Sequence, residues 1–137
     1  MDHRLTHLFD AAREAAQNAH APYSRFRVGA AIRSESGTIF AGCNVENAAY
    51  PVGICAEAGA IAAMIMHGSQ LIKDIAIVSL SENPCWPCGA CRQRIFEFAD
   101  QTTNVHVLDE DGLIKSHSIQ ALLPYAFGPD ALSNKTV

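Results

Sequence analysis

The sequence predicts a single α/β domain in which helices cover both faces of one mixed β-sheet. Three observations support this prediction. The chain has 137 residues, which is close to the ~150 typical of one domain, so we expect residues 1–137 to form a single domain. Its apolar residues switch between the helical and the strand repeat in the order α-β-β-α-β-α-β. Residues 75–80 form a continuous apolar run, which is typical of a buried and parallel strand.

The N-terminal third predicts a helix followed by a hairpin. Apolar residues recur at three and four positions before Pro22 ends the pattern, as expected of a helix with one buried face. This stripe consists of Leu5, Leu8, Phe9, Ala12, Ala15, Ala16 and Ala19. Residues 27–33 and 38–43 show strand patterns on either side of a turn at residues 34–37, so we expect them to pair in antiparallel fashion.

The middle of the chain predicts a buried helix. A polar loop over residues 44–54 leads into residues 55–67, which are apolar almost all round. A helix with so little polar surface is typical of a central position. Gly68 follows it as the expected C-terminal cap.

The second half predicts shorter elements. In order, they are the strand at 75–80, a helix at 89–99, a strand at 105–108 and a candidate fifth strand at 113–118. Ser118 is a candidate cap for a last short helix that ends near Pro124. Residues 128–137 carry little pattern.

Composition and charge exclude several classes of protein. Apolar residues make up 49% and charged residues 18%, as in a globular chain. A net charge of −4 is of the wrong sign for a surface that tracks nucleic-acid phosphates. We find no apolar run of the ~18 residues that a membrane span needs, and no basic-then-apolar leader. We therefore expect a cytoplasmic protein whose five cysteines act as thiols, metal ligands or nucleophiles rather than as disulfides.

The cysteines predict a catalytic zinc site. Cys88 and Cys91 form a Cys-x-x-Cys pair at the start of a predicted helix, where helix dipole and free N–H groups favour thiolates. A third thiolate from Cys55 gives zinc three protein ligands and leaves a fourth position for water. Glu57, two residues after Cys55, is close enough to reach that water without binding the metal.

Two other interpretations of the cysteines are open. Cys85 would complete a structural four-cysteine zinc site, but such a site has no use for a neighbouring carboxylate. A redox Cys-x-x-Cys motif leaves Cys55 and Glu57 unexplained. The combination of both segments therefore favours catalytic zinc.

At these residues the chain resembles the small, homotetrameric cytidine deaminases. Cys55-Ala56-Glu57 and the segment 87–91, Pro-Cys-Gly-Ala-Cys, fit the all-cysteine form of the zinc deaminase signature. The segments 22–31, 44–50 and 122–127 are also similar to the family, in the family's order. The resemblance covers nearly the whole chain. It implies a three-layer α/β/α sandwich around a five-stranded mixed sheet, one Zn²⁺ per chain, and a homotetramer.

The resemblance implies an activity. It is the hydrolytic deamination of cytidine and 2′-deoxycytidine to uridine and 2′-deoxyuridine, with release of ammonia, as in pyrimidine salvage. Cys55, Cys88 and Cys91 would hold zinc, which makes hydroxide available near neutral pH. Glu57 would take the water proton, pass it to N3 and later carry one to the departing amine.

The resemblance also implies the contacts with substrate. The matching positions are Asn44 and Glu46 at the ribose hydroxyls, Phe26 against the base, Ala56 through its N–H at the base edge, Trp86 through its carbonyl at the leaving ammonia, and Tyr50 and Phe127 reaching a neighbouring subunit's site.

The chain departs from the family pattern at one charged position. Many members read Cys-Ala-Glu-Arg, whereas Ala58 follows Glu57 here. Three thiolates around Zn²⁺ leave a negative charge that weakens the metal as a Lewis acid. We expect Arg92, the dipoles of the two helices and N–H···S bonds to offset it. Cys85 matches no family position and is interpreted as a free thiol near the site.

Three alternative functions are considered. A deaminase of another base or nucleoside, such as blasticidin S, is less consistent with the ribose pair Asn44 and Glu46. A polynucleotide-editing deaminase needs a basic channel, which the net charge of −4 argues against. A zinc module without enzymatic activity would leave no open coordination position.

Overall fold

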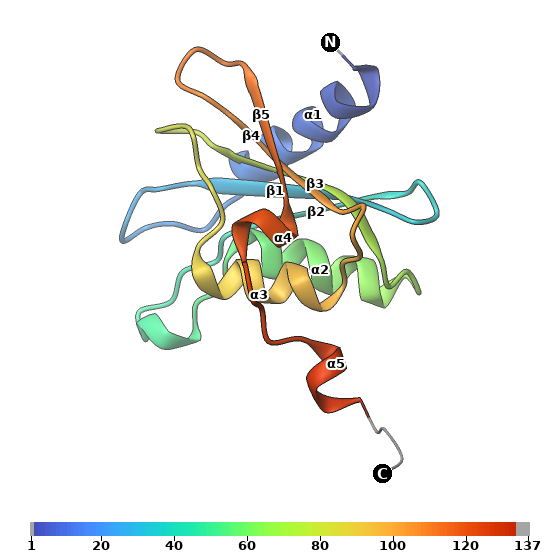
Figure 1. The fold of residues 1–137 in the computed structure, drawn as a ribbon. Coiled ribbons are helices and arrows are strands. Elements are labelled where there is room, and N and C mark those ends of the chain that lie inside the picture. Colours follow the sequence, from blue (N-terminus) through green and yellow to red (C-terminus); the bar gives the residue numbers. More distant parts are fainter. Residues whose placement is uncertain (1, 134–137) are drawn as a thin grey trace.

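Five strands form one mixed sheet in the computed structural model, which describes residues 2–133 (Figure 1). The strands are β1 (Val28–Ser34), β2 (Ile39–Cys43), β3 (Ile72–Ser79), β4 (Asn104–Leu108) and β5 (Ile114–Ser118), and their order is β2-β1-β3-β4-β5. β3 and β4 are parallel, and the other neighbouring pairs are antiparallel. The predicted hairpin, the parallel pairing of the apolar strand and the candidate fifth strand are confirmed.

Helices cover both faces of this sheet. α1 (His3–Gln17) lies on one face, and α2 (Ala56–Met66), α3 (Gly89–Glu97) and the short α4 (Ile119–Leu122) lie on the other (Figure 1). This arrangement is the predicted three-layer α/β/α sandwich. The Asp2 carboxylate caps α1 by accepting from the Arg4 N–H at 2.9 Å.

Each face of the sheet has its own apolar core. The predicted stripe of α1 buries Leu8, Phe9, Ala12 and Ala16, and the first three of these pack with Ala31, Ala76 and Val78 of the sheet. The other core is larger and is built mainly of isoleucines and valines of the sheet beneath Met64 of α2 and Ile95 of α3. Full burial of such a side chain contributes about 1.5–3 kcal/mol, so this core holds α2 and α3 in place.

Two glycines allow the helices to approach the sheet backbone closely. A Cβ on Gly29 would lie 1.8 Å from the Ala12 carbonyl oxygen, and one on Gly42 would lie 2.3 Å from the Ala60 nitrogen. Real Cβ atoms do not tolerate such distances to backbone atoms. The absence of a side chain on β2 at Gly42 therefore fixes where α2, and hence its N-terminus, lies.

Apart from shifts of one or two residues at the ends of elements, the predicted elements differ from the structure in three places. Gly68 takes a left-handed φ of +90° after α2, and the Ser118 hydroxyl accepts from the Ala121 N–H at 3.1 Å, so both predicted caps are confirmed. β3 begins at Ile72 rather than at residue 75. The sequence pattern did not predict this start because the polar residues Lys73 and Asp74 interrupt the apolar run.

The other two differences are short helices that the sequence did not predict. The polar loop contains a 3-10 turn, η1 (Tyr50–Val52), and the tail contains α5 (Pro129–Leu132). Residues 134–137 of the predicted tail lie outside the described part. None of the helices within residues 2–133 has the length and apolar character needed to cross a membrane.

Candidate active site

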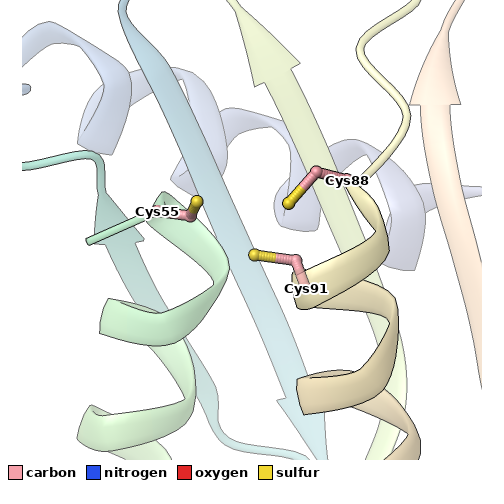
Figure 2. Close-up of side chains that lie close together, drawn as sticks. All are labelled: Cys55, Cys88 and Cys91. Atoms are coloured by element: carbon pink, nitrogen blue, oxygen red, sulfur yellow. The ribbon is translucent and has the colours of Figure 1, made fainter. Parts of the chain in front are cut away.

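The N-termini of α2 and α3 meet at a cluster of three cysteines. Cys55 is the N-cap residue of α2, Cys88 is the N-cap residue of α3, and Cys91 lies buried in the first turn of α3. Their Sγ atoms lie within 4.8 Å of one another. Figure 2 shows the three sulfurs pointing toward a common centre, one from α2 and two from α3. The structure thus brings together the three predicted zinc ligands.

The surroundings raise the pKa of two of the thiols and lower the pKa of the third. Burial raises the pKa of Cys55, and burial together with the negative charge of Glu57 raises the pKa of Cys91. Partial burial of Cys88 acts in the same sense, but the N–H groups of Cys91 and Ala90 at the start of α3 outweigh it and lower the pKa of Cys88. The predicted effect of the helix N-terminus is therefore seen at Cys88.

Glu57 lies beside this cluster in the first turn of α2. Its side chain is buried, with a relative exposure of 4%. Burial raises the pKa of Glu57 from its ordinary value of 4.5. A carboxyl group with a raised pKa is suited to accept and return a proton near neutral pH.

A cavity of about 650 Å³ opens above the cysteines and Glu57. That volume is in the range of pockets that bind small molecules. Six of the seven predicted substrate residues line it: Phe26, Asn44, Glu46, Tyr50, Ala56 and Trp86. Tyr50 was expected to reach a neighbouring subunit's site, whereas here it lines the cavity of its own chain. Phe127 does not line it; its side chain is 61% exposed, and its carbonyl accepts from Gln93 Nε2 at 2.7 Å.

Asn44 braces the wall of the cavity. Its Oδ1 accepts from the Val28 N–H at 2.9 Å, and its Nδ2 donates to the Phe26 carbonyl at 2.8 Å. An amide oxygen has a second lone pair and an amide nitrogen a second hydrogen, so the oxygen can still accept from a ligand and the nitrogen can still donate to one. Asn44 therefore sets the position of Phe26 and still presents polar atoms to the cavity.

Glu46 braces the same wall from the other side. Its Oε1 accepts from the Tyr23 and Ser24 N–H groups at 3.0 and 3.1 Å, and its Oε2 accepts from the Ser24 hydroxyl. The Ser24 hydrogen bonds hold the pKa of Glu46 below its usual value. A carboxylate that stays ionised is a strong acceptor for hydroxyl groups.

Sequence reasoning missed several residues that line the cavity. They include Tyr23, Ser24, Asn47 and Ile54. The rings of Tyr23 and Tyr50 meet edge to face, with centroids 6.0 Å apart. Tyr23 and Ser24 stand inside the 22–31 segment that carries the resemblance, so their place in that motif was the available signal.

Cys85 lies close to the cluster without belonging to it. Within residues 2–133, one group of three or more His, Cys, Asp or Glu side chains could share a metal ion, and it consists of Cys55, Cys88 and Cys91. Cys85 lines the cavity next to Trp86, and burial raises the pKa of its thiol to about 11. This geometry argues against a four-cysteine site and agrees with the prediction of a free thiol near the centre.

The cation beside the thiols is not the predicted one. Arg92 donates from Nε to the Pro87 carbonyl at 2.8 Å and from a terminal nitrogen to the Leu122 carbonyl at 3.0 Å, so it braces the backbone. Arg94 instead donates to Cys91 Sγ at 3.3 Å. The reason is helical geometry, because a residue three positions after Cys91 lies on the same face and the next residue does not.

The donor set fits zinc. Three cysteine sulfurs that converge on one point are typical ligands of Zn²⁺. Burial and the nearby carboxylate disfavour thiolates at Cys55 and Cys91, and a dication at the centre offsets that cost. Zn²⁺ held by these three ligands would keep a coordination position for water, and Glu57 is the buried carboxylate next to the cluster.

Comparisons with known proteins agree with this geometry. Residues 3–107 match the family model described as the cytidine and deoxycytidylate deaminase zinc-binding region. The chain is 42% identical to the cytidine deaminase of Sporosarcina psychrophila over 121 residues, which cover 88% of this chain and 89% of that protein. It is 36% identical to the cytidine deaminase of Halalkalibacterium halodurans over 134 residues, 98% of this chain and 100% of the other.

A solved structure shares the fold. The crystal structure of cytidine deaminase from Burkholderia pseudomallei superimposes with a TM-score of 0.84 at 40% identity, covering 93% of this chain and 100% of that one. Fold, cysteine cluster and sequence similarity over nearly the full length therefore agree, and this chain belongs to the cytidine deaminase family.

Proposed function

We propose that this protein deaminates cytidine and 2′-deoxycytidine hydrolytically to uridine and 2′-deoxyuridine, with zinc as cofactor and ammonia as the second product. The observation that carries the proposal is the buried carboxylate of Glu57 beside three convergent thiols, two of which line the same nucleoside-sized cavity as Glu57. Such a reaction serves pyrimidine salvage.

Zinc would be held by Cys55, Cys88 and Cys91. Bound there, it supplies the Lewis acidity that makes a water nucleophile available near neutral pH. The cysteines orient that chemistry because two of them are fixed at helix N-caps and the third at a buried helical position.

Glu57 moves the protons of the reaction in this proposal. Its carboxylate takes a proton from water, gives it to N3 of the base, and later carries a proton to the departing amine. One group serves all three steps because N3, C4 and the amine are neighbouring atoms of the base. Burial supports this role, since it raises the pKa of Glu57 and so favours its protonated form between the steps.

The walls of the cavity hold the nucleoside. We assign Phe26 to the face of the base, the Ala56 N–H to its edge and the Trp86 carbonyl to the leaving ammonia. The Asn44 amide accepts from or donates to the ribose hydroxyls, and the Glu46 carboxylate accepts from them. All five residues line the cavity, which supports the assignment.

We also propose that the protein is a homotetramer whose sites are shared between chains. Tyr50 lines the cavity with its side chain 75% exposed, and Phe127 stands outside it with 61% exposed. Aromatic side chains this exposed are suited to cover a site on a neighbouring chain. Residues 1–137 would form one domain per chain. A cytoplasmic location is consistent with the five free thiols, since a reducing compartment maintains them.

Loss of the cytosine absorbance band with purified protein tests the activity. We expect cytidine and 2′-deoxycytidine to be converted, and conversion to stop when a chelator removes the metal. A panel with blasticidin S and a cytosine-containing oligonucleotide separates the alternatives. Conversion of either of these, with no conversion of the free nucleosides, would overturn the proposal.

A further inference from the structure

The cysteine cluster needs a positive charge close to it. Three thiolates around one Zn²⁺ leave a net negative charge, and the buried Glu57 adds another when ionised. Cys91 and Glu57 are buried, and there such a charge is costly unless a cation or hydrogen-bond donors lie within reach. The following argument rests on the proposed zinc site.

Arg94 is the side chain that meets this need. It lies three residues after Cys91 on α3, and its guanidinium donates to Cys91 Sγ at 3.3 Å. Within residues 2–133 no carboxylate lies within 4.0 Å of the Arg94 guanidinium, so its charge is not neutralised by an ion pair there. Cys91 is the buried member of the cluster, where a hydrogen bond to sulfur matters most.

The other candidates for this role are occupied or uncharged. Arg92 is committed to the carbonyls of Pro87 and Leu122. Ala58, in the first turn of α2, carries no charge at the position where many family members have arginine.

We infer that Arg94 is the charge-balancing and positioning residue of the zinc centre in this chain. Arg94 supplies this function from the second turn of α3, and it acts through the Cys91 thiolate rather than on substrate. Arg94 does not line the cavity, so it is not a catalytic residue.

Removal of Arg94 is expected to weaken metal binding. The guanidinium stabilises the negatively charged metal centre, and that stabilisation is lost with the charge. Partners that contact metal ligands are typically worth about 10–100-fold in metal affinity. We expect a loss of this size in Arg94→Met, which keeps an unbranched apolar stem and removes both charge and donor groups.

The test compares three variants for zinc transfer to a chromophoric chelator. Arg94→Met should release zinc about 10–100-fold faster than the parent. Arg94→Lys, which retains a charge, should release it at an intermediate rate. Arg13→Met is the matched control, because it removes an exposed arginine of α1 that pairs with Asp10 on the opposite face of the sheet. Parent-like zinc release by Arg94→Met, or equal release by Arg94→Met and Arg94→Lys, would overturn the inference.

Two further measurements separate charge balance from a general structural role. The zinc-free forms of Arg94→Met and the parent should unfold at the same temperature. In the Co²⁺-loaded protein, the thiolate-to-cobalt charge-transfer band should shift in Arg94→Met and stay unchanged in Arg13→Met. A less stable zinc-free variant with an unshifted band would show that Arg94 only supports the fold. Neither readout depends on the substrate, so failure of the proposed deamination would remain distinguishable.

Catalysis gives the last readout. Since Arg94 lies outside the cavity, zinc-saturated Arg94→Met should lose kcat with little change in KM for cytidine. A change confined to KM would place Arg94 in substrate binding and contradict the inference.

Discussion

Glu57 is the residue on which every proposed proton transfer depends. We predict that Glu57→Gln keeps one zinc per chain and the native fold but loses about 10²–10⁴-fold in kcat, because an amide cannot carry the proton. Steady-state kinetics with metal analysis of the same sample checks this. Turnover close to that of the parent would exclude Glu57 as the acid and base.

Cys85 provides the complementary test at the metal. Its sulfur lies outside the convergent cluster, so we predict that Cys85→Ser keeps one zinc per chain and most of the activity. Cys88→Ser, which removes a member of the cluster, is the matched control and should lose the metal. Loss of zinc in Cys85→Ser would favour the structural four-cysteine site.

The sequence predicted the three zinc ligands better than it predicted which arginine contacts them. The spacing of Cys88 and Cys91 at a helix start, together with Cys55, was sufficient to predict the cluster that the structure shows. Nearness in sequence to Cys91 did not decide whether Arg92 or Arg94 contacts the thiols. It depends on which face of α3 each side chain occupies, and the i, i+3 relation to Cys91 was the signal that pointed to Arg94.

The position of α2 on the sheet is an element-scale property that depends on Gly42. A Cβ there would lie 2.3 Å from the Ala60 backbone, so Gly42→Ala must push α2 away from β2. We predict a loss of about 3 kcal/mol in the free energy of unfolding, at the upper end for overpacking, and weaker zinc binding because Cys55 moves with the helix. Denaturant unfolding and zinc titration measure both effects.

Gly89→Ala is the matched control for that prediction. A Cβ at Gly89 meets no atom within 4 Å, and its φ is not in the left-handed range. Its stability should stay close to that of the parent. Equal stability of Gly42→Ala and Gly89→Ala would show that α2 does not rest on Gly42 as described.

The connection between α3 and β4 predicts a dependence of stability on pH. The Thr102 hydroxyl donates to Asp100 Oδ1 at 2.5 Å, and this bond, with the Thr102 N–H, lowers the pKa of Asp100 from its ordinary value of 3.8. A carboxyl whose pKa is lowered by folding stabilises the fold above its unfolded pKa, and this stabilisation disappears as the pH falls through the folded pKa.

We therefore predict that Thr102→Val lowers the unfolding temperature at neutral pH. The difference from the parent should begin to shrink as the pH falls below about 4 and disappear once the pH is below the lowered folded pKa of Asp100, where the carboxyl is protonated in both proteins. Zinc-free protein is used so that acid release of the metal does not contribute. A difference that stays constant down to the lowest pH would exclude Asp100 as its source.

Long, periodic elements were predictable, and short ones were not. The α1 stripe spans four turns, so its repeat is unambiguous. Within α1 the structure buries four of the expected residues and leaves Leu5 and Ala15 half-buried. η1 and α5 have three and four residues, less than or barely one helical period, so no repeat can appear in their sequence. α5 did carry one signal, because Pro129 stands at its first position after Gly128.

The whole molecule exposes apolar side chains on the side of the sheet that carries the site. The sequence predicted that α2 is buried all round, yet Ile65 and Met66 are 40% and 83% exposed in the single chain. α5 extends away from the body of the molecule, and Leu132 within it is 76% exposed (Figure 1). Both features are accounted for if other copies of the chain cover them, as proposed for the tetramer.

Phe127 tests that assembly through the active site. It stands outside the cavity of its own chain, so in a shared site it would close the cavity of a neighbour and keep water from the base. An aromatic contact is worth about 1 kcal/mol, so we predict that Phe127→Ala loses about fivefold in kcat/KM while its own chain keeps zinc.

Mixing two defective variants then separates shared from independent sites. Glu57→Gln chains keep Phe127, and Phe127→Ala chains keep Glu57, so co-refolded hybrids contain some sites with both residues intact. Activity of the mixture should exceed the average of the two parents refolded separately, and light scattering should show a tetramer. A fully active monomer at the assay concentration would exclude shared sites, because each chain would then complete its own cavity without Phe127 of a partner.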